Sequence, residues 1–459
     1  MRKTLLLPLV CFLATGAAGQ TSTTTQAAVT GQSVTTGQLA DRVKADFLHA
    51  WGAYKKYAWG HDGLRPLSKT PYDWYGTPFY MTALDALDTM ILMGLTEEAD
   101  STREFLVRNL SFDKDVYVRH FEFTIRLLGG LISSYQLTGD KRLLDLADDL
   151  GTRMLPAFVT ETGMPYREVN LKTGAVRDSI SNPGEIGTLL VEYGALTALT
   201  GKSKYYNHAK IALLQVYEKR SATTGLVGEA IDVTTGEWTK TDSHLSACID
   251  SYYEYLLKCA LLFDDSDCKE MWLTSYDAIN KHLLDSSAAG FWYGHADMNT
   301  GKRGKTWFGA LDAFFPAVLA LYGDTERAGR IMQSCYTMWT RFGIEPEQYN
   351  YATGKAEKTP YYLNPEIMES AYYLYQKTKD PVYLHMGRTF LDSLDTYCRL
   401  DEGYAELKNA VTKQKSDRME SYFLAETLKY LYLLFASPDV LPFDKYIFNT
   451  EAHPIRKTW

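Results

Sequence analysis

Two glutamates lie one helical turn apart at the start of an expected helix, in the stretch Asn-Pro-Glu-Ile-Met-Glu-Ser-Ala from 364 to 371. Asn364 is suited to cap this helix and Pro365 to occupy its first position. Glu366 would then feel the positive end of the helix dipole and stay ionised, as a base or as the partner of a cation. Glu369 follows on the same face, so the two charges need a cation, a basic residue or water between them. A well-capped surface helix with acids in its first turn is the alternative.

The same layout recurs along the chain, because acidic residues stand just before or at the start of apolar helical stretches. They are Asp85, Glu122, Glu185, Asp250, Asp312, Glu366 and Glu420. A short turn and a second helix follow most of these stretches, as at 136–140, 199–202, 321–324 and 376–380. Self-similarity of this kind indicates a repeat architecture of seven units that cannot bury their apolar faces alone.

Two helical stretches have no partner within the repeat. Residues 39–59 show helical periodicity without a preceding unit, and residues 420–435 form a helix with no second helix after it. Pairing these two stretches closes a ring of seven inner and seven outer helices. The inner helices would then bring their acidic N-terminal ends to one mouth. Strand signals are sparse and favour small hairpins between units, near 225–238 and 291–294.

Other side chains could do chemistry at the same mouth. Glu122 and Arg126 are four residues apart, where an arginine orients a carboxylate; an ordinary intrahelical salt bridge would have the same spacing. Asp250 begins a helix rich in tyrosine, and Tyr422 and Glu426 share one helical stripe. Near the C-terminus, the apolar run 446–448 leads to a polar Asn-Thr-Glu tip, either as a hairpin entering an apolar interior or as a tail docked on the surface.

Length and charge limit the function classes. A chain of 459 residues that is 46% hydrophobic, with continuous periodicity and no internal linker, favours one large domain. The net charge of −8 and the pI near 5.7 argue against nucleic acid or an anionic membrane as a partner.

The N-terminus has the features of an export signal. Residues 1–19 combine Arg2 and Lys3, a short apolar run and small residues, which predicts a signal peptide too short to span a membrane. Residues 20–38 are rich in Thr, Ser, Gln and Gly and are expected to form a disordered linker. The folded domain should therefore cover residues 39–459 of a soluble protein exported to the periplasm or secreted.

Several stretches together resemble glycoside hydrolase family 47, the class I α-1,2-mannosidases, and suggest a bacterial member. They occur in family order from about residue 40 to the C-terminus: Ala58-Trp-Gly-His-Asp62, Asp85-Ala-Leu-Asp-Thr-Met90, Phe121-Glu-Phe-Thr-Ile-Arg126 with Leu128-Gly-Gly130, Asp250-Ser-Tyr-Tyr-Glu-Tyr-Leu-Leu-Lys258, Pro365-Glu-Ile-Met-Glu-Ser370, Met419-Glu-Ser-Tyr-Phe-Leu-Ala-Glu-Thr-Leu-Lys429 and Phe448-Asn-Thr-Glu-Ala-His-Pro454. The resemblance implies an all-α fold, an (α/α)7 barrel plugged by a C-terminal β-hairpin. It also implies a monomer that uses Ca²⁺ to cleave terminal α-1,2-linked mannose from mannobiose or high-mannose glycans with inversion.

The resemblance assigns roles position by position. It makes Glu366 the base that activates water and Glu122 the general acid, with Asp250 the third catalytic carboxylate; either of the last two could deliver the proton. Thr450 should bind Ca²⁺ through its hydroxyl and carbonyl oxygens, with waters held by Glu369, Glu426 and Glu451. Substrate contacts are expected from Arg126, Glu185, Tyr422 and Glu426.

One departure from the family pattern leaves other functions open. Asn364 stands where relatives usually have arginine directly before the Pro-Glu of the base motif. A catalytically weak, lectin-like module that binds mannose glycans is one alternative. Another α/α-barrel enzyme, such as a glucosidase or sugar epimerase, is a second, although such enzymes lack the terminal Asn-Thr-Glu hairpin.

Overall fold

The computed structural model describes residues 35–287 and 290–457, and the described residues from Thr36 onward form one compact unit. The expected signal peptide, residues 1–19, lies outside the described residues, as does most of the expected linker. Helix α1 (Thr36–Tyr57) already includes residues 36–38, so the folded domain begins three residues earlier than expected. The added turn precedes Leu39 and Ala40, which are buried.

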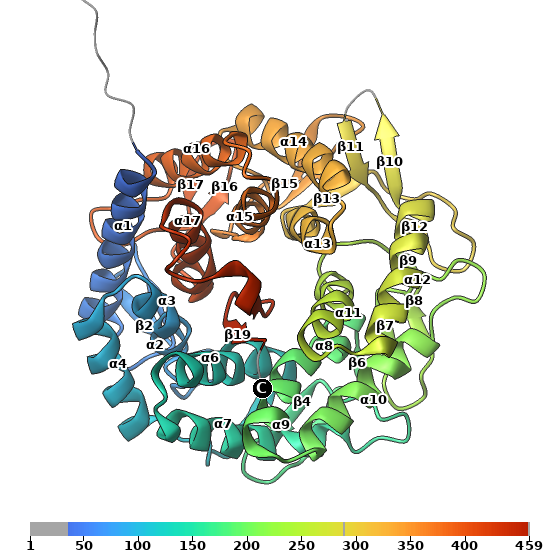
Figure 1. The fold of residues 1–459 in the computed structure, drawn as a ribbon, viewed down its shortest axis with the longest axis horizontal. Helices are drawn as coiled ribbons and strands as arrows, with labels where there is room; N and C mark the ends of the chain where they lie inside the picture. Colours follow the sequence, from blue (N-terminus) through green and yellow to red (C-terminus); the bar gives the residue numbers. More distant parts are fainter. Residues whose placement is uncertain (1–34, 288–289, 458–459) are drawn as a thin grey trace, which may run out of the picture. The chain divides into compact units, whose positions relative to one another are not determined.

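Seven helix pairs form a ring in the described residues, as the repeat predicted (Figure 1). The inner helices are α3 (Leu87–Leu92), α6 (Gly129–Thr138), α9 (Leu190–Thr200), α11 (Asp250–Phe263), α13 (Phe315–Tyr322), α15 (Glu366–Thr378) and α17 (Leu428–Phe435). Their outer partners, in the same order, are α4 (Thr96–Asn109), α7 (Lys141–Met154), α10 (Lys204–Glu218), α12 (Ser266–His282), α14 (Thr325–Phe342), α16 (Val382–Tyr397) and α1.

The contact between α1 and α17 closes the ring. The first helix of the chain and the last therefore form one unit, which confirms the expected pairing of the two unpartnered stretches. Phe47, Trp51 and Tyr54 of α1 are buried in this closure.

Inner and outer helices differ in sequence because they differ in surroundings. Inner helix α13 is buried from Phe315 to Leu321, as expected for a helix covered on all sides. Outer helix α7 buries only one stripe, which includes Leu143, Ala147 and Leu150 at helical spacing. Sharp turns join the pairs; Gly139, for example, ends α6 in the left-handed conformation at φ 75°.

Short elements lead into several of the inner helices. They are α2 (Met81–Asp85), α5 (His120–Glu122) with the π-helical segment η1 (Phe123–Leu128), α8 (Pro183–Gly187), the 3-10 segment η3 (Leu311–Phe314) and the π-helical segment η4 (Phe423–Thr427). Two further 3-10 segments are η2 (Leu155–Phe158) and η5 (Phe443–Lys445). Five of the seven repeated acids lie in or next to these elements, and the other two, Asp250 and Glu366, are the first residues of α11 and α15. Each acid thus precedes or begins an inner helix, so the ring gathers them at one end.

The connections between helix pairs form small antiparallel sheets. They pair β1 (Gly63–Arg65) with β2 (Thr70–Tyr72); β3 (Tyr117–Arg119) with β4 (Glu168–Asn170), and β4 with β5 (Val176–Arg177); β6 (Ile180–Ser181) with β7 (Ala230–Asp232), and β7 with β8 (Trp238–Lys240); β9 (Asp242–Ser243) with β12 (Ala296–Asp297); β10 (Leu284–Ser287) with β11 (Gly290–Tyr293); β13 (Trp307–Gly309) with β14 (Gln348–Asn350), and β14 with β15 (Lys355–Lys358); and β16 (Leu407–Asn409) with β17 (Gln414–Lys415). The hairpins expected near 225–238 and 291–294 correspond to β7–β8 and β10–β11.

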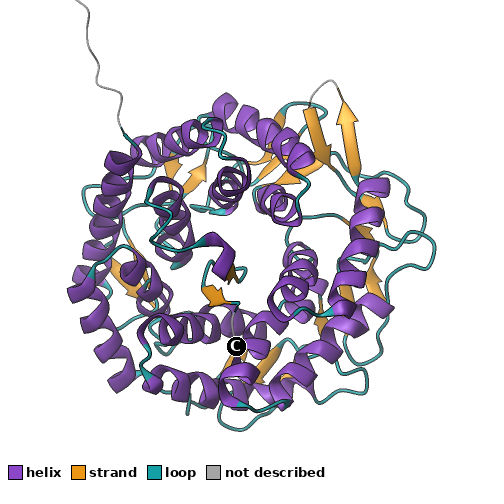
Figure 2. Cartoon of the chain, in the orientation of Figure 1, coloured by secondary structure: helices purple, strands orange, loops and turns teal. Residues whose placement is uncertain are grey.

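The C-terminal hairpin lies inside the ring, where β18 (Tyr446–Phe448) pairs with β19 (Pro454–Arg456) (Figure 2). Strand β18 contacts α11 and β19 contacts α6. Gly129 of α6 allows this close approach, because a Cβ there would lie 2.6 Å from Nδ2 of Asn449. Ile447, Phe448 and Ile455 are buried, so the hairpin enters the apolar interior and is not a tail docked on the surface. None of the helices described here is long and apolar enough to cross a membrane.

Candidate active site

One cavity of about 440 Å³ opens at the end of the ring where the acids gather. Glu122 from α5, Asp250 from α11 and Glu366 from α15 all line it. Every other predicted site residue lines it as well: Arg126, Glu185, Glu369, Tyr422, Glu426, Thr450 and Glu451. The structure thus brings together side chains from five inner helical units and the hairpin tip.

Glu366 differs from the expectation in its cap and its charge. Helix α15 begins at Glu366 without a side-chain cap, and Oδ1 of Asn364 accepts the backbone N–H of Tyr362 at 3.2 Å. Burial, together with the carboxylates of Glu369 and Asp250, raises the pKa of Glu366 to about 8. The helix N-terminus does not outweigh these effects, so without a cation the carboxyl group favours its protonated form near neutral pH, and the predicted ionised base needs a cation nearby. Among the described residues, Oε2 of Glu366 has no hydrogen-bond partner.

Asp250 is held at the start of α11 by its own backbone turn. Its Oδ1 accepts the backbone N–H of Ser251 at 2.8 Å. Burial raises its pKa to about 7, and the nearby carboxylates of Glu254 and Asp312 add to the shift. Near neutral pH, Asp250 can therefore hold a proton and release it.

Arg126 orients Glu122 and connects it to the hairpin. Nε of Arg126 donates to Oε2 of Glu122 at 2.9 Å, while its Nη1 contacts Glu451 and lies 3.8 Å from Asp85. Its guanidinium also lies 5.6 Å from the ring centroid of Tyr422. Arg126 belongs to η1, whose π-helical bonding shifts the register of the side chains; such segments are frequent at functional sites.

Two arginines that sequence reasoning did not single out fix Glu185. Arg119 forms an ion pair with it, and Nε of Arg167 donates to its Oε2 at 2.6 Å. Both arginines line the cavity. Arg119 lies in β3, paired with Glu168 of β4, and this pairing brings Arg167 beside it. The sequence could have indicated Arg119 as a site residue, because it lies three residues before Glu122. Nothing in the sequence around Arg167 indicates a site residue, because its position depends on the pairing of β3 with β4.

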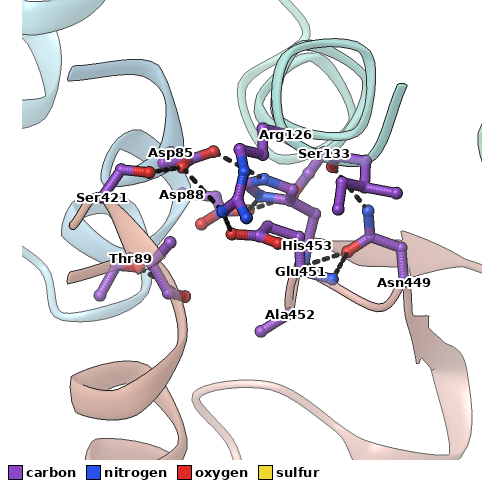
Figure 3. A network of polar contacts seen from close by, with 12 residues as sticks. Asp85, Asp88, Thr89, Arg126, Ser133, Ser421, Asn449, Glu451, Ala452 and His453 are labelled. Atoms are coloured by element: carbon purple, nitrogen blue, oxygen red, sulfur yellow. Dashed lines mark hydrogen bonds and ion pairs between the residues drawn. The ribbon is translucent and has the colours of Figure 1, made fainter. Parts of the chain in front are cut away.

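A network of polar contacts holds the tip of the C-terminal hairpin (Figure 3). Oδ1 of Asn449 accepts the backbone N–H groups of Glu451 at 3.0 Å and His453 at 2.8 Å. Its Nδ2 donates to the carbonyl of Ile125 at 2.8 Å. These bonds fix the turn that carries Thr450 to the cavity, where the backbone N–H of Thr450 donates to the Tyr255 hydroxyl at 3.2 Å.

A buried ion-pair network supports the hairpin from behind. Nδ1 of His453 lies 2.7 Å from Oδ2 of Asp88, and Nζ of Lys429 lies 2.7 Å from its Oδ1. Lys429 also donates to the carbonyl of Ala452 at 2.7 Å. Despite burial, the positive charges of Lys429 and His453 lower the pKa of Asp88 to about 2. The charges are therefore paired, and the pairs attach the hairpin to α3 and α17.

Comparison with known proteins assigns the family. A model of glycosyl hydrolase family 47 matches residues 46–457. The chain belongs to this family. Among family 47 relatives, it is 38% identical to the ER degradation-enhancing alpha-mannosidase-like protein 2 of Mus musculus, over 90% of this chain and 77% of that protein. It is 36% identical to the endoplasmic reticulum mannosyl-oligosaccharide 1,2-alpha-mannosidase of Homo sapiens, over 89% of this chain and 62% of that protein.

A solved family 47 structure has the same architecture. The alpha-1,2-mannosidase from Trichoderma reesei matches with a TM-score of 0.84 and 27% identity, over 92% of this chain and 99% of that one. The all-α (α/α)7 barrel is thereby confirmed. These relatives are eukaryotic, so the expectation of a bacterial member is not supported.

The carboxylates of this family 47 cavity form a set of oxygen donors suited to a hard cation. Glu369, Glu426 and Glu451 line the cavity together with Thr450. Burial raises the pKa of Glu369 to about 8, partly offset by Lys258, and raises the pKa of Glu426 well above its ordinary value. Such shifts mark a surplus of negative charge that a cation would relieve. An all-oxygen donor set fits Ca²⁺, which takes six to eight oxygen ligands.

Proposed function

We propose that this protein is a calcium-dependent, inverting exo-α-1,2-mannosidase that removes terminal α-1,2-linked mannose from mannobiose or high-mannose glycans. The observation that carries the proposal is the meeting of Glu122, Asp250 and Glu366 with the Thr450 hairpin tip in one cavity. Membership of family 47, whose relatives include a 1,2-alpha-mannosidase, supports the same reaction.

Inverting hydrolysis needs an acid on the leaving oxygen and a base on a water across the sugar ring, with carboxyl groups about 6.5–9.5 Å apart. Glu366 is the proposed base. Its buried Oε2, free of hydrogen bonds among the described residues, is available to accept a proton from water. Ionised Glu366 is the active form of the base. Because the pKa of Glu366 is raised, activity should increase with pH. A bound cation or substrate that stabilises the charge would lower this pKa and move the increase to lower pH.

Glu122 and Asp250 are the two groups proposed to supply the proton. Arg126 holds Glu122 by a 2.9 Å hydrogen bond, which orients its carboxylate. The pKa of Asp250 is raised to about 7, so Asp250 can carry a proton near neutral pH. The pH profiles of activity in Glu122→Gln and Asp250→Asn show which residue is the proton donor. Only the variant that lacks the proton donor loses the decrease in activity at alkaline pH.

Thr450 is the proposed Ca²⁺ ligand, with Glu369, Glu426 and Glu451 holding waters around the ion. When bound, Ca²⁺ would supply positive charge that orients the attacking water and two adjacent sugar hydroxyls. Arg126, Glu185, Glu426 and Tyr422 are the proposed contacts of the terminal mannose. The two arginines hold the carboxylate of Glu185 in place, where its oxygens can accept hydrogen bonds from sugar hydroxyls.

The test is release of mannose from α-1,2-mannobiose by the purified protein, with Ca²⁺ and then after chelation. The proposal predicts release that stops on chelation and returns with added Ca²⁺. Activity that survives removal of the metal would instead favour another type of α/α-barrel enzyme.

A lectin-like function is the second candidate, because Asn364 lines the cavity where family members usually have arginine. An amide there cannot form the paired, charged contact that arginine makes to a carboxylate. Binding of mannobiose in calorimetry without any release of mannose would support this function. Release of mannose, together with its loss in Glu366→Gln, would exclude it.

A further inference from the structure

Three side chains that could bind a metal meet on a two-stranded ribbon outside the proposed active site. In the β9–β12 pair, Ser243 lies opposite Ala296 and Asp242 opposite Asp297. Continuing this antiparallel register by one position places His244 opposite His295. Because side chains alternate between the faces of a strand, Asp242 and His244 share one face. One ring nitrogen of each histidine and one oxygen of Asp242 lie within 4.8 Å of one another.

The two imidazoles are buried, and the carboxylate faces the solvent. The side chains of His244 and His295 are 7% and 8% exposed, and that of Asp242 is 27% exposed. The rings pack with centroids 4.5 Å apart. An ion could therefore enter past Asp242 and meet two nitrogens that are already ordered by packing.

The electrostatic surroundings favour a cation. Nδ1 of His295 lies 2.9 Å from Oδ2 of Asp242, and Nε2 of His244 lies 3.8 Å from Oε2 of Glu229. Lys305 and Lys240 contact the two carboxylates at 3.4 and 2.8 Å, but their side chains are 50% and 62% exposed and can swing into solvent. Asp242 and the two imidazoles then remain as one cluster, with the carboxylate of Glu229 next to His244.

We propose that Asp242, His244 and His295 bind a divalent transition-metal ion of the Zn²⁺ type, with Glu229 as a fourth ligand. Imidazole nitrogen with carboxylate oxygen is a ligand set of zinc sites, whereas Ca²⁺ prefers oxygen alone. Ligand atoms around tetrahedral Zn²⁺ are about 3.3 Å apart, so the cluster must contract slightly, which rotation of the partly exposed Asp242 allows.

Metal binding would replace protons in this cluster. The ion takes the place of the proton shared by Nδ1 of His295 and Asp242, which is released. Nδ1 of His244 accepts the backbone N–H of Ser246 at 3.2 Å, so in the metal-free protein Nε2, which faces Glu229, carries the ring proton. Metal binding at Nε2 would move this proton to Nδ1. The hydrogen bond from Ser246 is then lost, because Nδ1 carries the ring proton.

The site lies just before a segment of the proposed active site. The chain runs from His244 to Cys248 and Asp250, both of which line the cavity. A metal ion held by strands β9 and β12 would fix the start of this segment. The site shares no residue with the proposed Ca²⁺ ligands, so the two metals can be tested separately.

Metal titration of the chelator-treated, full-length protein tests the proposal. In calorimetry we expect the protein to bind one equivalent of Zn²⁺. Titrations in buffers of different ionisation enthalpy should show that protons are released on binding. With Co²⁺ as the probe, we expect the visible spectrum of a four-coordinate ion. His295→Gln and His244→Gln should each weaken Zn²⁺ binding at least 10-fold. Asp242→Asn changes the most exposed ligand and should also weaken Zn²⁺ binding. This milder variant keeps the test valid if a histidine variant fails to fold.

Two matched variants serve as controls. His61 has a similar histidine–carboxylate contact, 3.0 Å to Asp73, but is not part of the three-residue cluster, so His61→Gln should leave Zn²⁺ binding unchanged. Thr450→Ala should change Ca²⁺ binding and leave Zn²⁺ binding intact. The proposal is overturned if the folded protein binds no Zn²⁺, if the cluster variants keep wild-type Zn²⁺ affinity, or if His61→Gln loses as much; the cluster would then be a hydrogen-bond network.

Discussion

Replacing Glu366 by glutamine should abolish activity and at the same time stabilise the protein. In the folded state, burial and the neighbouring carboxylates raise the pKa of Glu366 from 4.5 to about 8. Between these two values the folded state binds more protons than the unfolded state, so this group lowers stability as pH rises. Glutamine does not titrate and removes that loss.

The magnitude follows from the shift. Between pH 4.5 and pH 8, each pH unit lowers the free energy of unfolding of the wild type by about 1.4 kcal/mol through this group. At pH 7, where only the part of the shift between pH 4.5 and pH 7 counts, the loss amounts to about 3 kcal/mol. We expect a measured gain of about 1–3 kcal/mol, since the new amide must also find hydrogen-bond partners. Turnover should fall by about 10²–10⁴, because only proton transfer to the base is removed.

The assay compares unfolding of the wild type and Glu366→Gln in chelator at pH 5 and pH 8, with turnover measured in parallel in Ca²⁺. The stability gap should be small at pH 5 and widen toward pH 8. Glu270→Gln, an exposed glutamate on outer helix α12, is the control and should show no such widening. A gap that does not grow with pH, or near-normal turnover in the variant, would refute the reasoning.

Three further predictions concern the residues around the hairpin. Thr450→Ala should weaken Ca²⁺ binding and activity together, and an unchanged Ca²⁺ affinity in calorimetry would remove Thr450 from the metal site. Lys429→Met should destabilise the protein by about 3 kcal/mol in denaturant unfolding, because it removes one of the two cationic partners of buried Asp88 and leaves only His453; adding Asp88→Asn should restore part of the loss, and a loss below about 1 kcal/mol would contradict the ion-pair account. Arg126→Lys keeps the charge but cannot contact Glu122 and Glu451 at once, so kcat/KM should fall at least about tenfold, whereas an unchanged value would show that Arg126 does not orient Glu122.

The ring and most of the site could be predicted from the sequence because each depends on local patterns. The recurring acids mark the starts of the seven units, and the short turns mark the pairing of inner with outer helices. The hairpin could be predicted from the apolar run before Asn449, and Asn449 and His453 at its tip approach α6 at Gly129 and Gly130, where side chains are absent. Glu122 and Arg126 meet at the four-residue spacing that the sequence shows, across the junction of α5 and η1.

Features that depend on distant contacts could not be predicted. Glu366 was expected to be ionised from its place at a helix start, but burial among other carboxylates decides its pKa. Arg167 reaches Glu185 only through the pairing of β3 with β4, and His244 meets His295 only through the pairing of β9 with β12. These strands are two or three residues long, too short for a sequence signal to identify both partners.

The most direct test of the central claim is the configuration of the mannose released from α-1,2-mannobiose, followed by proton NMR from the first minutes of reaction in Ca²⁺. A base and an acid acting across the sugar ring from the carboxylates of one cavity predict that β-mannose forms first and then mutarotates. Initial release of α-mannose, or no release by a folded and calcium-loaded protein, would contradict this account.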